Sequence, residues 1–106
     1  MQHARSLFDA LADDTRRQVL ELLAGGERSA GELAAHFPIA RPSVSRHLRV
    51  LREAGLVNWR GDAQRRLYRI EADRLTEVAD WVDQIRRAWS QRLDALERHL
   101  DETRRD

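Results

Sequence analysis

The last third of this 106-residue chain carries an apolar stripe that constrains its fold more than any other feature. The stripe steps by three or four residues through Leu75, Val78, Val82, Ile85, Trp89, Leu93, Leu96 and Leu100. This spacing predicts one long helix over 73–101, and residues 73–100 alone would extend roughly 42 Å at 1.5 Å per residue. A chain this small cannot cover such a helix. The stripe therefore predicts a partner, most simply a second copy of the chain.

Three shorter helices are predicted in the first part of the chain. They cover 6–12, 14–24 and 30–36. Asp13 is placed as the N-cap of the second helix, and Ser29 and Glu32 have the spacing of a capping box that opens the third. Apolar residues recur with helical spacing in each segment, so each helix has a side to bury.

A fourth helix is predicted over 42–54. Pro42 suits the first helical position, where its missing N–H leaves no hydrogen bond unmade. Val44, Leu48 and Leu51 share one face of this helix and should point into the core.

Two short strands are predicted after the fourth helix, over 56–60 and 66–70. Turn-forming residues over 61–65 lie between them and indicate a hairpin. The predicted fold is thus mainly α-helical with one small β-hairpin, in a single domain with flexible ends at 1–5 and 102–106.

Charge is concentrated in the middle of the chain, although the whole chain carries only +1. Residues 41–69 contain eight arginines and two acidic residues, a net charge of +6. Residues 1–40 contain four arginines and six acidic residues, and residues 70–106 contain seven arginines and ten acidic residues. A basic segment between acidic flanks indicates a localised site for a polyanion.

The basic segment coincides with two short helices, a tight turn and a hairpin, which is the order of a winged helix-turn-helix. The recognition helix over 42–54 would enter the major groove, and the wing over 60–66 would lie on the phosphate backbone or in the minor groove. The candidate DNA-binding residues are Arg41, Ser43, Ser45, Arg46, His47, Arg49, Arg60, Gln64, Arg65 and Arg66.

Three stretches resemble the ArsR/SmtB family of bacterial repressors. They are the runs over 7–23, 41–57 and 65–70, and the second is the most specific. The resemblance implies a homodimer that binds a palindromic operator and represses transcription. It also implies that Ser43, Ser45, Arg46 and His47 read bases, whereas Arg41, Arg49 and the wing arginines mostly contact phosphates. For His47, a packed position at the turn is the alternative.

The resemblance further implies that the first and last helices form the dimer interface. The residues expected there are Leu7, Phe8, Leu11, Val78, Val82, Ile85, Trp89, Leu93 and Leu96. Trp81 and Trp89 are interpreted as core or interface residues rather than as a ligand cage. Trp59 is expected to pack against the scaffold, and His36 to lie on the surface at a helix end.

The chain departs from the family where many members bind metal. It has no cysteine, and its last helix has a single histidine, His99, together with Asp80 and Asp83. Structural zinc normally takes four ligands, mostly Cys or His. The sequence therefore predicts no bound metal or other cofactor and an inducer that is not a thiolate-bound metal, with a zinc-dependent sensor as the alternative.

No catalytic constellation is present in the sequence. There is no Gly-rich phosphate loop and no Ser/His/Asp set whose spacing predicts convergence, so an enzyme is not expected. No stretch is long and apolar enough for a membrane span, and we expect a soluble cytoplasmic protein. A helical module that binds another protein through the last helix is the alternative function from a different class.

Overall fold

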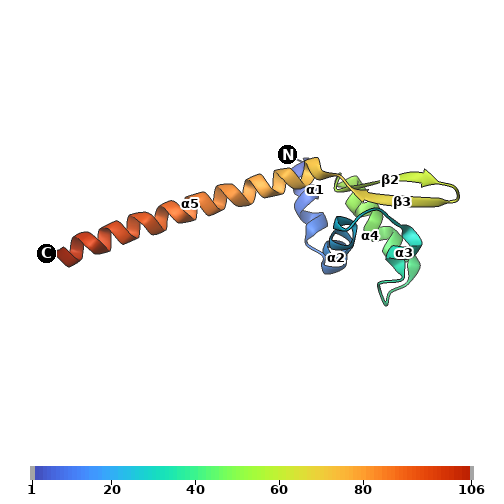
Figure 1. Cartoon of the computed structure of the whole chain (residues 1–106), viewed down its shortest axis with the longest axis horizontal. Helices are drawn as coiled ribbons and strands as arrows, with labels where there is room; N and C mark the ends of the chain where they lie inside the picture. Colours follow the sequence, from blue (N-terminus) through green and yellow to red (C-terminus); the bar gives the residue numbers. More distant parts are fainter. Residues whose placement is uncertain (1, 106) are drawn as a thin grey trace. The chain divides into compact units, whose positions relative to one another are not determined.

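The computed structural model describes the backbone of residues 2–105 and the side chains of residues 7–104. Its elements are α1 (Gln2–Leu11), α2 (Asp14–Ala24), β1 (Arg28–Ser29), α3 (Ala30–Ala34), α4 (Arg41–Glu53), β2 (Val57–Asp62), β3 (Arg65–Ile70) and α5 (Ala72–Arg105) (Figure 1). The mainly helical fold with a β-hairpin is therefore confirmed. The chain divides into two compact units, and the boundary between them in the sequence falls between Arg74 and Leu75.

Both end helices are longer than the sequence predicted. α1 begins at Gln2, so residues 2–5, expected as a flexible end, have a helical backbone. α5 continues to Arg105, past the predicted end at 101. Neither extension contains glycine or proline. The residues that are present there propagate a helix readily once it has formed.

Asp13 caps α2 as predicted. Its carboxylate accepts a hydrogen bond of 3.0 Å from the backbone N–H of Arg16. This bond lowers the pKa of Asp13 below its ordinary value of 3.8, because it stabilises the charged carboxylate. α2 ends at Ala24, and Gly26 then takes a φ of +135° that a glycine accommodates without strain.

We expect Asp13→Ala to lower the free energy of unfolding by about 0.5–2 kcal/mol at pH 7, because α2 loses its cap. The native pKa is depressed, so the stabilisation is present above pH 3.8 and is lost as the pH falls through the native pKa. Urea unfolding of both proteins across this range measures the effect. Asp13→Asn is the matched control, since asparagine caps about as well but does not titrate. An Asp13→Ala deficit that stayed constant down to pH 2 would contradict the assignment.

The capping box of α3 is also confirmed. The Ser29 hydroxyl accepts from the backbone N–H of Glu32 at 3.1 Å, and the Glu32 carboxylate accepts from the backbone N–H of Ser29 at 3.3 Å. α3 is shorter than predicted and ends at Ala34. α4 begins one residue early, with Pro42 inside its first turn, where proline is tolerated.

The core lies among the first four helices and the sheet. Val44, Leu48 and Leu51 of α4 are buried, as their spacing predicted. They share the core with Val19, Leu20, Leu23, Leu33, Leu56 and Val57. Packing this face inward leaves the opposite face of α4 at the surface.

The sheet has three antiparallel strands in the order β1-β3-β2. β1 was not predicted, because two residues are too few to show an alternating pattern. β2 and β3 pair from Val57↔Ile70 to Asp62↔Arg65, so the loop is only Ala63 and Gln64 rather than the predicted 61–65. Ala63 has a φ of 58°, in the left-handed region that glycine favours over other residues.

α5 has 34 residues and thus a length of roughly 51 Å. Its large apolar side chains are exposed along the stripe: Val82, Ile85, Trp89, Leu93, Leu96 and Leu100. Among the described helices, none combines the length and the apolar character that a membrane span requires.

Candidate nucleic-acid interface

The exposed side of α4 carries a row of arginines. Arg41, Arg46, Arg49 and Arg52 are all exposed, as is Ser45, whereas Ser43 is half-buried. The row exists because the buried residues Val44, Leu48 and Leu51 turn the opposite side of the helix inward. A helix with this distribution presents guanidinium groups to whatever lies against it.

All four of these arginines keep their charge uncompensated. Within the described part of the chain, no carboxylate lies at ion-pair distance from Arg41, Arg46, Arg49 or Arg52. The only acidic residue of α4 is Glu53, at its last position. The side is therefore electropositive and can attract phosphate.

His47, predicted as a base contact, is turned toward α2. Its side chain is only 19% exposed, and its Nδ1 lies 3.7 Å from the Asp13 carboxylate. The same nitrogen is 3.3 Å from the Arg16 guanidinium. The structure thus favours the packed alternative for His47, because the helical rotation that exposes Arg46 places the next residue against α2.

Arg16 joins three helices, and the sequence analysis did not single it out. Its guanidinium donates to the backbone carbonyls of Asp9 and Ala10 at the end of α1, at 3.0 and 2.7 Å. Together with the contact to His47, these bonds link α1, α2 and α4. The signal that could have found it is its position one turn after the N-cap Asp13, where a long donor side chain can reach the carbonyls that end the preceding helix.

Two basic hollows flank the row of arginines. One, of about 260 Å³, lies between α4 and β3 and is lined by Ser45, Leu48, Arg49, Arg52, Glu53, Arg66 and Tyr68. The other, of about 380 Å³, is lined by Ser29, Ala30, Gly31, Arg41, Gln64, Arg65 and Arg66. The fold therefore brings α4 and the tip of the wing, which the sequence could only place on separate elements, to shared surfaces.

Two wing arginines are engaged by carboxylates. Arg60 donates to both oxygens of Glu27, at 2.9 and 3.2 Å. Arg65 donates to Asp62 at 2.8 Å and lies 3.9 Å from Glu32. Arg60 lowers the pKa of Glu27, and Arg65 lowers that of Asp62, in each case by a hydrogen bond to the charged carboxylate. These two predicted DNA contacts are therefore partly neutralised in the free protein.

We expect Glu27→Gln to tighten binding to any DNA duplex by about two- to five-fold, because it releases the charge of Arg60. The plot of log K against log[salt] should become steeper by roughly one, the value for one added phosphate contact. Fluorescence anisotropy on operator and random duplexes measures both quantities. Glu21→Gln on α2 is the control, since no arginine pairs with Glu21 within the residues described. An unchanged slope would show that Arg60 does not reach DNA even when released.

Trp59 has arginines as neighbours. The guanidinium of Arg66, on β3, lies over the indole at 4.3 Å from the ring centroid. That of Arg52, on α4, is at 5.9 Å. The half-buried Trp59 was expected only to pack against the scaffold, but its ring also makes cation–π contacts.

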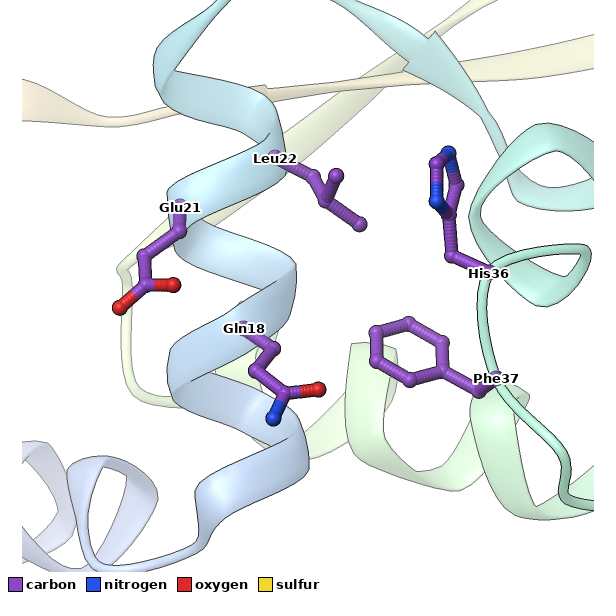
Figure 2. A pocket seen from close by; sticks show the side chains of 5 residues that line it. All are labelled: Gln18, Glu21, Leu22, His36 and Phe37. Carbon is purple, nitrogen blue, oxygen red and sulfur yellow. The ribbon is translucent and has the colours of Figure 1, made fainter.

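A further hollow, of about 280 Å³, lies between α2 and the segment after α3. Figure 2 shows Leu22 and Gln18 on one side of it and His36 and Phe37 on the other. His36 is exposed at the end of α3, as expected. Among the described residues, no three His, Asp or Glu side chains come together as a metal ligand set.

Of the α1 residues expected at a dimer interface, Leu7 is only 1% exposed and belongs to the core. Phe8 is 38% exposed and Leu11 is half-buried. On α5, Val78 is half-buried, whereas Val82, Ile85, Trp89, Leu93 and Leu96 are exposed. The surface that α5 offers to a partner is thus larger than that of α1.

Known proteins match this chain in sequence and in fold. Residues 13–58 match the family model described as bacterial regulatory protein, arsR family. The transcriptional repressor SdpR of Bacillus subtilis (strain 168) is 36% identical over 77 residues, which cover 73% of this chain and 86% of SdpR. The family model covers α2, α3 and α4 and ends at the start of β2.

Two solved structures agree with these matches. The crystal structure of the ArsR family transcriptional regulator RHA00566 has a TM-score of 0.77 at 33% identity and covers 83% of this chain and 97% of its own. The solution structure of the homodimeric winged helix-turn-helix DNA-binding domain Mb0332 from Mycobacterium bovis has a TM-score of 0.66 at 32% identity. It covers 78% of this chain and 80% of its own. With its exposed row of arginines, its wing and these relatives, the chain belongs to the ArsR family of transcriptional regulators and carries a winged helix-turn-helix DNA-binding domain.

Proposed function

We propose that this protein is a homodimeric, sequence-specific repressor that binds a palindromic operator. α4 enters the major groove, where Arg46 and Ser45 face base edges, while Arg41 and Arg49 contact phosphates. Gln64, Arg65 and Arg66 of the wing lie along the backbone or in the minor groove. His47 supports α4 from the side of α2.

The observation that carries the proposal is the uncompensated charge of Arg41, Arg46 and Arg49 on one exposed side of α4. An enzyme or a general interaction module has no need to keep three guanidinium groups free of carboxylates on a helix of major-groove width. A DNA-binding helix gains affinity from such free guanidinium groups, because each phosphate that an arginine neutralises releases a counterion.

The dimer rests on the exposed apolar stripe of α5, with Phe8 and Leu11 of α1 as further expected contacts. Burying an Ile or Leu side chain stabilises an interface by about 1.5–3 kcal/mol. Dimerisation would bury the stripe of each of the two copies. The homodimeric state of the similar domain Mb0332 supports this arrangement. Two-fold symmetry of the protein then calls for a palindromic operator.

An inducer, where one acts, is not a thiolate-bound metal, since the chain has no cysteine. The zinc-dependent alternative requires operator affinity to change when zinc is added. We expect excess zinc to leave the affinity unchanged, and a change of ten-fold or more, about 1.4 kcal/mol, would favour the alternative.

The test is binding of the full-length protein to the DNA upstream of its own gene, measured against salt and against random duplex. The affinity should fall steeply with salt and exceed that for random duplex by about 1,000-fold or more. A reporter gene behind the same fragment should lose expression when the protein is supplied. Salt-independent binding, or no preference over random DNA, would refute a DNA-binding regulator of this region, and a rise in reporter expression would make the protein an activator.

A further inference from the structure

The wing and the recognition helix are connected through one aromatic ring. In the hairpin register Trp59 pairs with Tyr68, and Gly61 pairs with Arg66. Side chains two residues apart on a strand lie on the same face, so Trp59, Tyr68 and Arg66 share one face of the hairpin. Because Gly61 has no side chain, the Arg66 side chain can lie across the strand onto the indole, where its guanidinium is 4.3 Å from the ring centroid.

An arginine of α4 also lies near the Trp59 ring. The guanidinium of Arg52 lies 5.9 Å from the centroid of Trp59, near the limit for a cation–π contact. One indole ring thus has guanidinium groups from two separate elements within cation–π distance. No carboxylate among the described residues pairs with Arg52 or Arg66.

Both arginines line the 260 Å³ hollow between α4 and β3. Arg49, Ser45 and Tyr68 line it as well. Glu53 is the single acidic residue of the lining, which therefore contains three arginines and one acidic residue. A hollow with this lining suits an anion that accepts several hydrogen bonds, as a phosphodiester does.

We propose that this hollow is a phosphate site for the DNA backbone and that Trp59 is its positioning residue. Trp59 does not contact the DNA. It holds Arg66 and Arg52 in the hollow before binding, so less side-chain entropy is lost when the phosphate enters. The proposal rests on the proposed function and adds to it Arg52 and Trp59, neither of which the sequence indicated as part of the interface.

The test uses the full-length protein with Trp59→Leu, which removes the aromatic face, and Trp59→Phe, which keeps one. Trp59→Leu should weaken binding to operator and random duplex alike by about five-fold, with little change in the salt slope because both arginines are still present. Trp59→Phe should stay within about two-fold of the wild type. Arg69→Ala is the control for loss of an arginine from the same hairpin, since Arg69 pairs with Glu71 and does not line the hollow.

A structural role for Trp59 is separated by a double-mutant cycle with Arg66→Ala. If the ring acts through Arg66, Trp59→Leu should have little further effect once Arg66 is removed. Additive losses would overturn the proposal. Should Trp59→Leu not fold, Arg66→Lys replaces it, because lysine keeps the charge but stacks poorly on a ring. A several-fold loss with Arg66→Lys supports the proposal, and an unchanged affinity overturns it.

Two further arms identify which idea fails. If the wild type and the Trp59→Leu variant bind DNA equally well, only this inference is overturned. If the wild type binds no DNA, the proposed function is overturned too. Replacing chloride with inorganic phosphate at equal ionic strength should weaken wild-type DNA binding, because free phosphate competes with the DNA backbone for the hollow. Trp59→Leu should reduce this loss, and a loss of equal size in both proteins would overturn the assignment.

Discussion

Trp89→Glu is expected to convert the dimer into a monomer and to weaken operator binding by about 100-fold or more, since the gain from binding two half-sites at once is lost. Trp89 lies in the middle of the α5 stripe and is 60% exposed in the single chain. Ile85, one turn earlier, is 49% exposed, and Ile85→Glu should act in the same way.

The size of the effect follows from the chemistry of an interface. A dimer would bury two copies of the new carboxylate in the apolar stripe. Removing these charges from water costs about 5 kcal/mol or more in total, even where Arg86 or Arg92, three residues away on the helix, can approach them. This cost weakens dimerisation by more than about 1,000-fold. Loss of the indole removes apolar burial in addition.

Light scattering and DNA binding measure the two consequences on the same sample. Gln91→Glu is the matched control, because it adds the same charge two residues away, on the other side of the helix. It should leave the dimer intact. If Trp89→Glu remained a dimer while circular dichroism showed an unchanged helix content, α5 would not be the interface.

Arg46→Ala is the second large effect, and we expect it to weaken operator binding by about 1–3 kcal/mol. Arg46 is exposed on α4, and no carboxylate among the described residues competes for its guanidinium. A guanidinium can bind two acceptors on a guanine edge at once, and alanine can bind none. Binding to random duplex should change far less, so the preference for operator should narrow.

Arg49→Ala is the matched comparison for Arg46. Arg49 lines the hollow between α4 and β3, where a phosphate rather than a base is expected. Its removal should weaken binding to all duplexes equally and reduce the salt slope by roughly one. Equal losses on operator and random DNA for Arg46→Ala would make Arg46 a phosphate contact instead.

Local patterns predicted much of the fold. The cap at Asp13, the capping box at Ser29 and Glu32, and the buried face of α4 all depend on residues three or four apart, and each is present in the structure. The hairpin was predicted in kind but not in loop length. Ala63 occupies a backbone conformation that residue type disfavours, so turn preferences suggested a longer loop than strand pairing allows.

The candidate site was predicted as a set of residues without their partners. Arg46 and Arg49 are exposed as expected, but Arg60 is paired with Glu27, 33 residues away. His47 meets Arg16, 31 residues away, and so lies against α2. No local pattern encodes contacts at such distances, because they depend on how the helices and the sheet pack.

By itself, the sequence determined that this chain has a basic helix-turn-helix segment followed by a wing and a long helix with an apolar stripe. Those features follow from helical periodicity, capping and charge, which act over a few residues. Only the tertiary structure decided which arginines keep their charge uncompensated and which are neutralised, and that Trp59 connects Arg66 to Arg52. The physical reason is that electrostatic and cation–π interactions depend on distance in space, and packing sets that distance.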